Sequence, residues 1–378
     1  MKTFRIWLKE EPSSPQNELL SEEAGAKADS SGKLREILVG KHLNGGNHMT
    51  SYRAEGKTPE QMHNTHAQKF YGDNFKNSKE YKLADNSAKK AAEHIKSHLQ
   101  KHGLGSVNRT VWTSQKSDHH SETGVHDENN TADLIVSTNK KKRITESSSD
   151  HKQSNKVAIS VKIGHSKVNY SNPGIKTYQE ISGANLSDHV KKHKETVESN
   201  LPSGPGSSHD KYKALIGSTN TSDQEKAKKI KQSSLDANKN IANSMKKSMA
   251  KKSHEELHHA IVHSVSPPTH LKHIVSRTKT QEKTGEHLSH HTYDLHKHVH
   301  EYMSHFKDLH VNPHNKSSTV TVHGTHHKTG KVMSVATFTV SAGGKPANHS
   351  PRGVVNLASE DHKDIKYTDK SEHMEHKL

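Results

Sequence analysis

Apolar side chains are scarce in this sequence, and their scarcity limits what the chain can fold into more than any other feature. Hydrophobic residues make up 28% of the 378 positions and aromatic residues 4%. Ordering a residue costs conformational entropy, which buried apolar area has to offset. We therefore expect one or two modest domains joined by polar segments, and not a single dense core over the whole length.

The charge balance points to an anionic partner. Lysine and arginine number 57 and the acidic residues 41, which gives a net charge of +16 with the 37 histidines neutral. Because imidazole titrates at about pH 6.5, mild acidification makes the chain still more basic. Lysine and arginine release condensed counterions when they contact phosphates, so nucleic acid is the expected partner. Charges that only keep the protein soluble are the alternative.

The sequence excludes several classes of protein. The sequence has no cysteine, which excludes disulfide scaffolds, cysteine-ligated zinc and thiol nucleophiles. No apolar run approaches the roughly 20 residues of a membrane-spanning helix, so no membrane partner is expected. Neither glycine-rich phosphate loop pattern occurs, which argues against kinase, ATPase and dinucleotide chemistry.

Helix signals come first along the chain and strand signals follow. Apolar spacing and helix-stop residues predict three helices, over residues 32–44, 58–71 and 85–103. Thr58 and Gln61 are placed to form a capping box at the start of the second helix. Three short β-branched runs then predict strands over 107–113, 132–137 and 157–163, and a helix is expected over 174–182.

The second half of the sequence predicts more helices and one hairpin. A Pro/Gly-rich break suggests a linker over residues 201–221. Helical spacing resumes over 222–265 and again over 286–309, and a β-hairpin is expected over 319–340 with its turn near Gly330. We expect a region of helices with a hairpin over 222–358, followed by a frayed tail over 359–378.

The most informative side chains lie on two of the expected strands. Asp133 opens the second strand, and Ser160, Val161 and Lys162 stand near the end of the third. Because side chains alternate between the two faces of a strand, Ser160 and Lys162 share one face. If the two strands pair as a hairpin, Asp133 and Lys162 converge. The alternative is that Asp133 is a turn residue and Lys162 a solvated strand end.

This order of residues resembles the PD-(D/E)XK nuclease superfamily. The core of that family has a helix with a glutamate, then strands with an aspartate and an (Asp/Glu)-x-Lys pair. Glu36, in Leu-Arg-Glu-Ile-Leu, stands where the helical glutamate is expected, ahead of Asp133 and Lys162. The resemblance implies an α+β fold, with a nuclease-like α/β module over residues 32–200 whose short mixed sheet is flanked by helices. It also implies hydrolysis of DNA phosphodiester bonds with Mg²⁺ or Mn²⁺.

The resemblance also implies a role for each residue. Asp133 would be the central metal ligand, Glu36 would complete the site, and the Val161 carbonyl would add an oxygen. Lys162 would orient or deprotonate the attacking water and neutralise developing charge.

Ser160 departs from the family pattern, because the family usually has Asp or Glu at this position. Glu36, or the loop residues Asp127 and Glu128, would have to supply the missing carboxylate. Three outcomes follow: an active variant, a weak enzyme, or a nuclease fold kept only for binding.

Basic and aromatic residues near these strands are expected to contact nucleic acid. The loop before the third strand contains a cluster of four cations: Lys140, Lys141, Lys142 and Arg143. After that strand, Lys167 and Asn169 would contact phosphate, and Tyr170 would either stack on a base or cover the core.

The first 31 residues are expected to form a targeting-like peptide and a disordered linker. The start Met-Lys-Thr-Phe, followed by Leu8-Lys9-Glu10, resembles the capsid-targeting peptide of internal head proteins of tailed bacteriophages, and Leu20-Ser21-Glu22 is a second site of the same type. The resemblance implies a phage protein that is processed by a prohead protease and packaged with capsid components. It would then lie in the virion interior and, after infection, in the host cytoplasm. An ordinary frayed terminus is the alternative.

Two competing hypotheses do not involve this site. His254-Glu255-Glu256-Leu257-His258 matches the H-E-x-x-H zinc motif, although its metzincin extension is absent and only a ligand such as Glu282 would be left to complete it. The histidines between residues 287 and 300 would bind a transition metal or simply form the solvated face of a helix. The leading alternative to a nuclease is a non-enzymatic virion protein that binds DNA or another capsid component.

Overall fold

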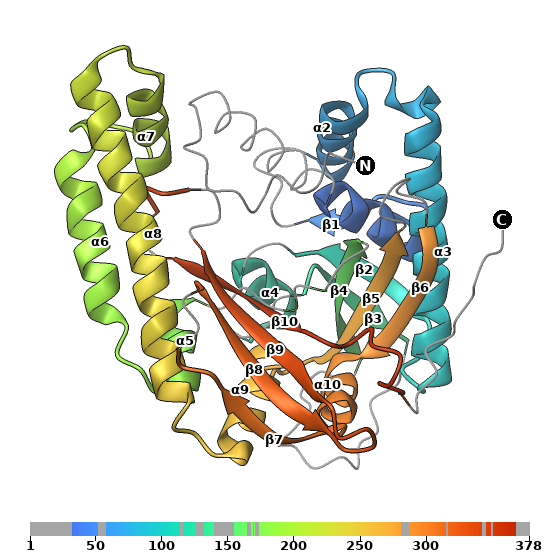
Figure 1. Cartoon of the computed structure of the whole chain (residues 1–378). Helices are drawn as coiled ribbons and strands as arrows, with labels where there is room; N and C mark the ends of the chain where they lie inside the picture. Colours follow the sequence, from blue (N-terminus) through green and yellow to red (C-terminus); the bar gives the residue numbers. More distant parts are fainter. Residues whose placement is uncertain are drawn as a thin grey trace.

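The computed structural model describes most of the chain after residue 31. The described residues are 32–51, 58–113, 116–125, 132–139, 155–164, 168, 170, 174–280, 287–314, 317–341, 345–348 and 351–367. They form an α+β structure with two β-sheets, as the sequence predicts (Figure 1).

The larger sheet has six strands in the order β1-β2-β3-β4-β5-β6. They are β1 (Thr50–Ser51), β2 (Val107–Trp112), β3 (Leu134–Thr138), β4 (Lys156–Gly164), β5 (Lys272–Thr280) and β6 (His287–Asp294). Strands β2, β3 and β4 form an antiparallel meander, and β5 adds to β4 in parallel. The sheet is therefore mixed, and the three strands expected between residues 107 and 163 are confirmed.

Helices of the N-terminal third cover one face of this sheet. They are a helix over residues 32–43, α2 (Pro59–Tyr71) and α3 (Lys79–Lys101), with a 3₁₀ turn at Phe75–Asn77. Their apolar residues share one core with the inner face of β3 and β4, which includes Leu38, Ile95, Leu134 and Ile159. The capping box at Thr58 and Gln61 is confirmed. Helix α3 begins six residues before the predicted start, where Ser78 caps it.

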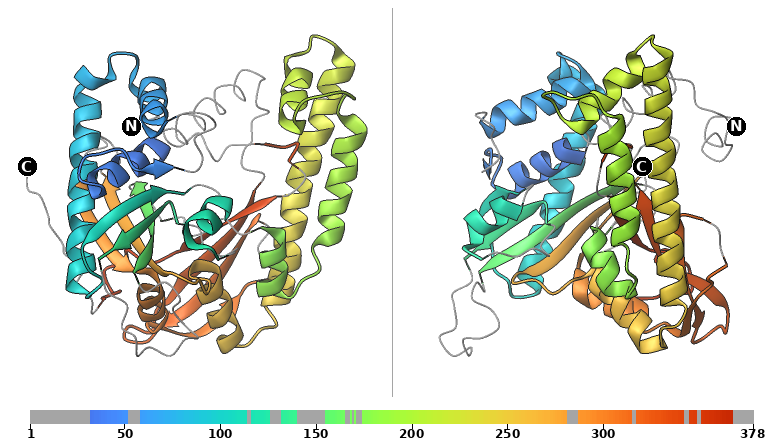
Figure 2. Two further views of the ribbon diagram at one scale, coloured as in Figure 1. Left: turned by 180° about the vertical axis from the view of Figure 1, so that it is seen from behind. Right: turned by 90° about the vertical axis from the view of Figure 1, so that its left-hand side faces the viewer.

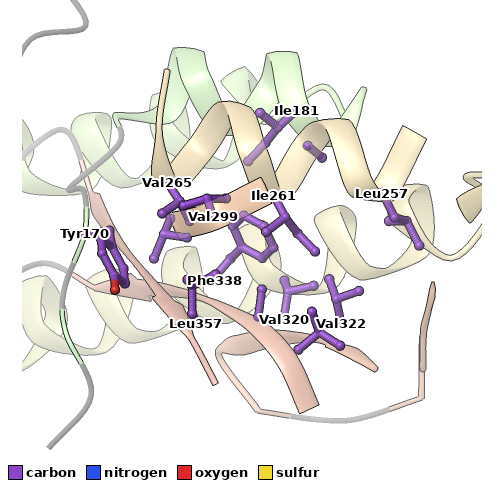
Figure 3. Packing of buried hydrophobic residues seen from close by; sticks show 14 of the residues in the cluster. Tyr170, Ile181, Leu257, Ile261, Val265, Val299, Val320, Val322, Phe338 and Leu357 are labelled. Carbon is purple, nitrogen blue, oxygen red and sulfur yellow. The ribbon is translucent and has the colours of Figure 1, made fainter. Parts of the chain in front are cut away.

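The smaller sheet is antiparallel, in the order β10-β9-β8-β7. Its strands are β7 (Phe306–Val311), β8 (Thr319–His326), β9 (Val332–Ser341) and β10 (Arg352–Leu357). The predicted hairpin is β8 and β9. Alternate residues of β8 and β9, such as Val320 and Phe338, are fully buried against helices (Figure 3).

Four helices pack on the inner face of the smaller sheet. They are α5 (Ile175–Ser182), α8 (Thr221–Met249), α9 (His254–Val265) and α10 (Leu295–Met303). Gly353 lets β10 approach α5 closely, because a Cβ at position 353 would lie 1.8 Å from the hydroxyl oxygen of Tyr178 on α5.

A bundle of three helices projects from this core. It consists of α6 (Ser187–Asn200), α7 (Ser208–Gly217) and the first half of α8, with its own apolar cluster around Tyr212 and Ile230. The bundle and the α2–α3 pair stand on opposite sides of the molecule (Figures 1 and 2). Residues 201–221 are thus not only a linker, because α7 forms there and buries Tyr212 and Leu215.

The structure differs from the sequence predictions in two further places. The helix expected over 286–309 is replaced by strand β6, helix α10 and the start of β7, because β6 pairs with β5 over almost its whole length. As a result, residues 272–294 complete the same sheet as residues 107–164. The tail beyond Leu357 does not fray at once, since Glu360 and Ile365 are buried.

Candidate active site

The first component of the candidate site is Glu36, on the helix over residues 32–43. Leu34, Ile37 and Leu38 bury one side of this helix in the core. The neighbouring Arg35 is buried and donates to the carbonyl of Ala84 at 3.0 Å and to the Thr278 hydroxyl at 2.9 Å. Arg35 therefore ties the helix to both α3 and β5, and this fixes the position of Glu36.

Asp133 lies immediately before β3 and is held by backbone hydrogen bonds on both sides. Its N–H donates to the carbonyl of Ile159 at 2.9 Å, and its carbonyl accepts from the N–H of Thr113 at 2.9 Å. Its carboxylate oxygen Oδ2 accepts from the N–H of Val161 at 2.7 Å. The carboxylate is thus oriented toward the end of β4, where Lys162 follows.

Lys162 and Asp133 form an ion pair at this end of the hairpin. The ammonium nitrogen Nζ lies 3.7 Å from Asp133 Oδ2, and the two side chains are 25% and 20% exposed. Such a pair keeps one side open to solvent, where a small ligand would have access to both charges.

Glu36 reaches the same place from the helical side. The indole N–H of Trp112 donates to Glu36 Oε2 at 2.8 Å. Burial and, after it, the negative charge of Asp133 raise the pKa of Glu36 to about 8, although the Trp112 hydrogen bond and the positive charge of Lys162 oppose the shift. Because the charges of Asp133 and Lys162 both change the pKa of Glu36, Glu36 lies close enough to each of them for electrostatic interaction.

Ser160 lies on the same face of β4 as Lys162, but it is turned toward β5. Its hydroxyl is within hydrogen-bond distance of His273 Nε2, at 2.9 Å. Burial lowers the pKa of His273 to about 3, and the charge of Lys162 acts in the same direction. The hydrogen-bond partner of Ser160 is thus a neutral imidazole and not a carboxylate. No local pattern around Ser160 predicts this contact with His273, because β5 begins more than a hundred residues after Ser160.

Helix α4 (Lys116–Thr123) is fixed on the meander by an ion cluster around the buried Glu122. Glu122 Oε2 accepts from Arg109 on β2 at 3.2 Å, and Glu122 Oε1 lies 3.1 Å from Nζ of Lys156 on β4. The same helix carries the buried His119, whose electrostatic effect on His273 adds to that of burial and Lys162 in lowering the pKa of His273.

The oxygen donors at this site suit a hard divalent cation. Glu36 and Asp133 supply carboxylates. The Val161 carbonyl projects from the same edge of β4 as its N–H, toward Asp133. Mg²⁺ often binds through only one or two carboxylates and keeps several water ligands. The described residues contain no group of three or more histidine, aspartate or glutamate side chains arranged to hold a metal ion. A cation bound here would therefore have few side-chain ligands, and backbone oxygens and water would complete its coordination.

Several predicted contact residues lie outside the described part of the chain. They are Lys140, Lys141, Lys142, Arg143, Lys167 and Asn169, together with the loop acids Asp127 and Glu128, the possible ligand Glu282, and the targeting-like N-terminus. Tyr170 is described and belongs to the core. Its hydroxyl donates to Glu360 and lies 2.9 Å from the hydroxyl of Tyr293, so its ring is not available to stack on a base.

The H-E-x-x-H segment begins helix α9. The second of its glutamates, Glu256, closes a capping box with Ser253, and His254 Nδ1 accepts from the N–H of Leu309 at 3.2 Å. The rings of His254 and His258 are 6.4 Å apart. The segment therefore caps the start of α9 and bonds it to β7. The histidines between 287 and 300 are divided between β6 and α10, and His290 is buried beneath α3.

Comparison with known proteins adds no assignment. No protein-family model matches this chain, and no curated protein or solved structure is detectably similar to it. Among the helices that the structure describes, none is long and apolar enough to cross a membrane.

Proposed function

We propose that this protein is a metal-dependent nuclease that hydrolyses phosphodiester bonds in DNA. The observation that carries the proposal is the convergence of Glu36, Asp133 and Lys162 at one end of the β3–β4 hairpin, with Lys162 Nζ 3.7 Å from Asp133 Oδ2. Two carboxylates and one ammonium are the groups that such a reaction needs, and they occur in the chain order of the family that the sequence resembles.

Each residue has a distinct task in this reaction. Glu36 and Asp133, with the Val161 carbonyl, would hold Mg²⁺ or Mn²⁺, which when bound stabilises charge on phosphate oxygens and lowers the pKa of water. The Val161 N–H and the Lys162 ammonium keep the Asp133 carboxylate in one orientation. Lys162 is the only one of the three side chains that carries positive charge, so it orients the attacking water and neutralises charge that develops on the phosphate.

The substrate class follows from the charge of the whole chain. A net charge of +16 attracts a polyanion over distances beyond the site itself. Nucleic acid offers both the polyanion and the scissile phosphate.

The test is plasmid cleavage with Mg²⁺ or Mn²⁺ and an EDTA control, using Asp133→Asn and Lys162→Met. The amide oxygen that Asp133→Asn introduces can still accept the Val161 hydrogen bond, so this variant should fold and lose cleavage by at least about a hundredfold. Matched controls are Asp236→Asn and Lys247→Met, which change exposed residues of α8 and should cleave normally. Equal cleavage by the site variants and the controls would refute the proposal.

A second outcome favours the non-enzymatic alternative. If the wild-type protein retains DNA with a steep dependence on salt concentration but never nicks it, the chain is a DNA-binding protein. The two carboxylates of the site offset the positive charge of Lys162. This favours the enzyme, because a surface that only binds DNA gains nothing from carboxylates beside a lysine.

A further inference from the structure

We infer that Trp112 is a positioning residue that sets the cation specificity of the candidate site, because it holds one oxygen of Glu36 and leaves only the other oxygen to bind a divalent cation. This inference rests on the proposed function, which it deepens by naming the residue that makes the site prefer Mg²⁺ or Mn²⁺ to Ca²⁺. Trp112 is not one of the residues that carry the family resemblance.

The indole ring of Trp112 is fixed by its packing and by its strand. Trp112 is 2% exposed and lies in the core that Leu38 and Leu134 also form. Its backbone pairs with Ser51 of β1 and with Leu134 of β3, so Trp112 lies between two strands of the sheet. A buried indole N–H needs an acceptor, and this one donates to Glu36 Oε2 at 2.8 Å. The ring therefore cannot turn away from Glu36 without leaving its N–H unpaired in the core.

The two carboxylate oxygens of Glu36 have different surroundings. Oε2 accepts the indole hydrogen bond, whereas Oε1 has no hydrogen-bond partner among the described residues. Oε1 is also not one of the polar atoms that the described residues enclose, and the Glu36 side chain keeps partial exposure. The carboxylate is thus anchored at one oxygen and open at the other.

The residue after Trp112 holds the second carboxylate of the site. The N–H of Thr113 donates to the backbone carbonyl of Asp133 at 2.9 Å. In the Asp133 side chain, Oδ2 accepts from the N–H of Val161 at 2.7 Å and lies 3.7 Å from Lys162 Nζ. Because Trp112 and Thr113 are consecutive, the end of β2 holds both carboxylates from one point.

The hydrogen bond at Oε2 limits how Glu36 can bind a cation. The positive end of the indole N–H dipole points at Oε2 and repels a cation there, so Glu36 would bind through Oε1 alone. Mg²⁺ suits this mode, because it prefers an octahedral set of ligands and often keeps several waters. Ca²⁺ takes more oxygen ligands and often binds both oxygens of one carboxylate. A single oxygen from Glu36 therefore favours the smaller cation.

Isothermal titration of Mg²⁺ and of Ca²⁺ into wild type and Trp112→Phe at pH 7.5 tests this role. Trp112→Phe keeps an aromatic ring in the core and removes the N–H, so both oxygens of Glu36 become available to a cation. We expect the ratio of Mg²⁺ affinity to Ca²⁺ affinity to fall by about tenfold, the effect of one hydrogen bond to a charged group.

The matched control is Ile95→Val, which removes one methyl group from the same core and keeps the indole. It should have the wild-type affinity ratio. A ratio that Trp112→Phe leaves unchanged, or that Ile95→Val lowers equally, would show that Trp112 only packs in the core, and would overturn the inference.

A second measurement needs neither turnover nor the Trp112→Phe variant. Trp7 and Trp112 are the two tryptophans of the chain, so Trp7→Phe leaves a single indole N–H signal in a ¹H–¹⁵N NMR spectrum. We expect saturating Mg²⁺ to shift this signal, and Glu36→Gln to remove most of the shift. Asp236→Asn, the exposed control on α8, should keep it. A signal that saturating Mg²⁺ leaves unchanged contradicts the inference.

These results separate the inference from the nuclease proposal. A protein that binds Mg²⁺ with the expected shift of the Trp112 signal but never nicks DNA refutes the nuclease and leaves the role of Trp112 intact. A protein that cleaves DNA while its Trp112 signal does not respond to Mg²⁺ refutes the role of Trp112 alone. A wild-type protein that neither binds Mg²⁺ nor cleaves DNA refutes both.

Discussion

The Nζ of Lys162 lies 3.7 Å from Oδ2 of Asp133, across the open end of a hairpin whose strands are Leu134–Thr138 and Lys156–Gly164. Neither residue belongs to the paired core of the hairpin, because Asp133 precedes β3 and Lys162 lies beyond the last β3–β4 pair. Their ion pair is therefore placed by the register of the strands and not by local sequence. The same end of the hairpin receives Glu36 from the helix above it, and this relationship supports the predictions that follow.

The first prediction concerns stability and pH in the absence of divalent cations. The pKa of Glu36 is raised to about 8 in the folded protein from 4.5. Between these values the folded state holds a proton that the unfolded state has released, so Glu36 makes the protein less stable as pH rises from about 4.5 to 8. Glu36→Gln removes this penalty and can still accept from Trp112. We expect the variant to be more stable than wild type at pH 9, by on the order of 2 kcal/mol, and to have no such advantage at pH 4.5.

Urea unfolding of both proteins at the two pH values measures this difference. Glu195→Gln, an exposed position on α6, is the matched control and should follow wild type. An advantage of Glu36→Gln that does not grow with pH would mean that Glu36 is ionised in the folded protein.

The second prediction concerns cation binding. A divalent cation at Glu36 and Asp133 has to displace the proton of Glu36, so its apparent affinity should rise as pH increases toward 8. Isothermal titration of Mn²⁺ at pH 6.5 and 7.5, in buffers of different ionisation enthalpy, should show about a tenfold gain and release of nearly one proton. Glu36→Gln should bind more weakly and lose the pH dependence. Binding that is equally strong at both pH values would exclude Glu36 as a ligand.

The third prediction concerns a substitution that introduces a carboxylate at position 160, where the family that the sequence resembles usually has Asp or Glu. Ser160→Asp adds a third carboxylate on the strand that ends at the site, two positions before Lys162. If this side chain turns from His273 toward the cation, it should tighten Mn²⁺ binding by about tenfold, since carboxylate number controls the affinity of hard cations. Without the cation, the added repulsion should make the variant less stable than wild type. Ser160→Asn has the same shape without the charge and should show neither effect. Equal Mn²⁺ affinity of the two variants would mean that position 160 faces away from the cation.

The fourth prediction concerns the buried network next to the site. Arg277 stands beside Lys162 in the β4–β5 register and donates to both carboxylate oxygens of Asp361, at 3.1 and 2.9 Å. It also lies 3.7 Å from the buried Glu360, which His298 contacts at 2.7 Å. Arg277→Leu removes the arginine beside the buried Glu360 and leaves only His298 as its basic neighbour, so we expect a loss of about 3 to 5 kcal/mol in unfolding free energy.

Asp361→Asn is the comparison for this variant. Because Asp361 is 44% exposed, its loss should cost less than about 1 kcal/mol. Similar losses for both variants would show that the stability comes from the exposed ion pair alone. Denaturant unfolding at pH 7 measures both.

Much of the local structure could be predicted from the sequence. The capping box at Thr58, the three β-branched runs and the β8–β9 hairpin depend on neighbouring residues, and each formed where the sequence predicts it. The failures lie where long-range pairing prevails over local spacing. Residues 287–294 have helical spacing, but they form β6 because β5 offers a strand with which to pair.

The sequence by itself determined which chemical groups enter the candidate site from residues 32–164, because their order and the alternation of strand side chains are local properties. Only the tertiary structure decided what surrounds them. Ser160 meets His273, 113 positions further along the chain, because β5 adds to β4 in parallel. Which strand adds in parallel depends on how the connecting helices pack against the sheet, so the residues of either strand alone do not predict the pairing.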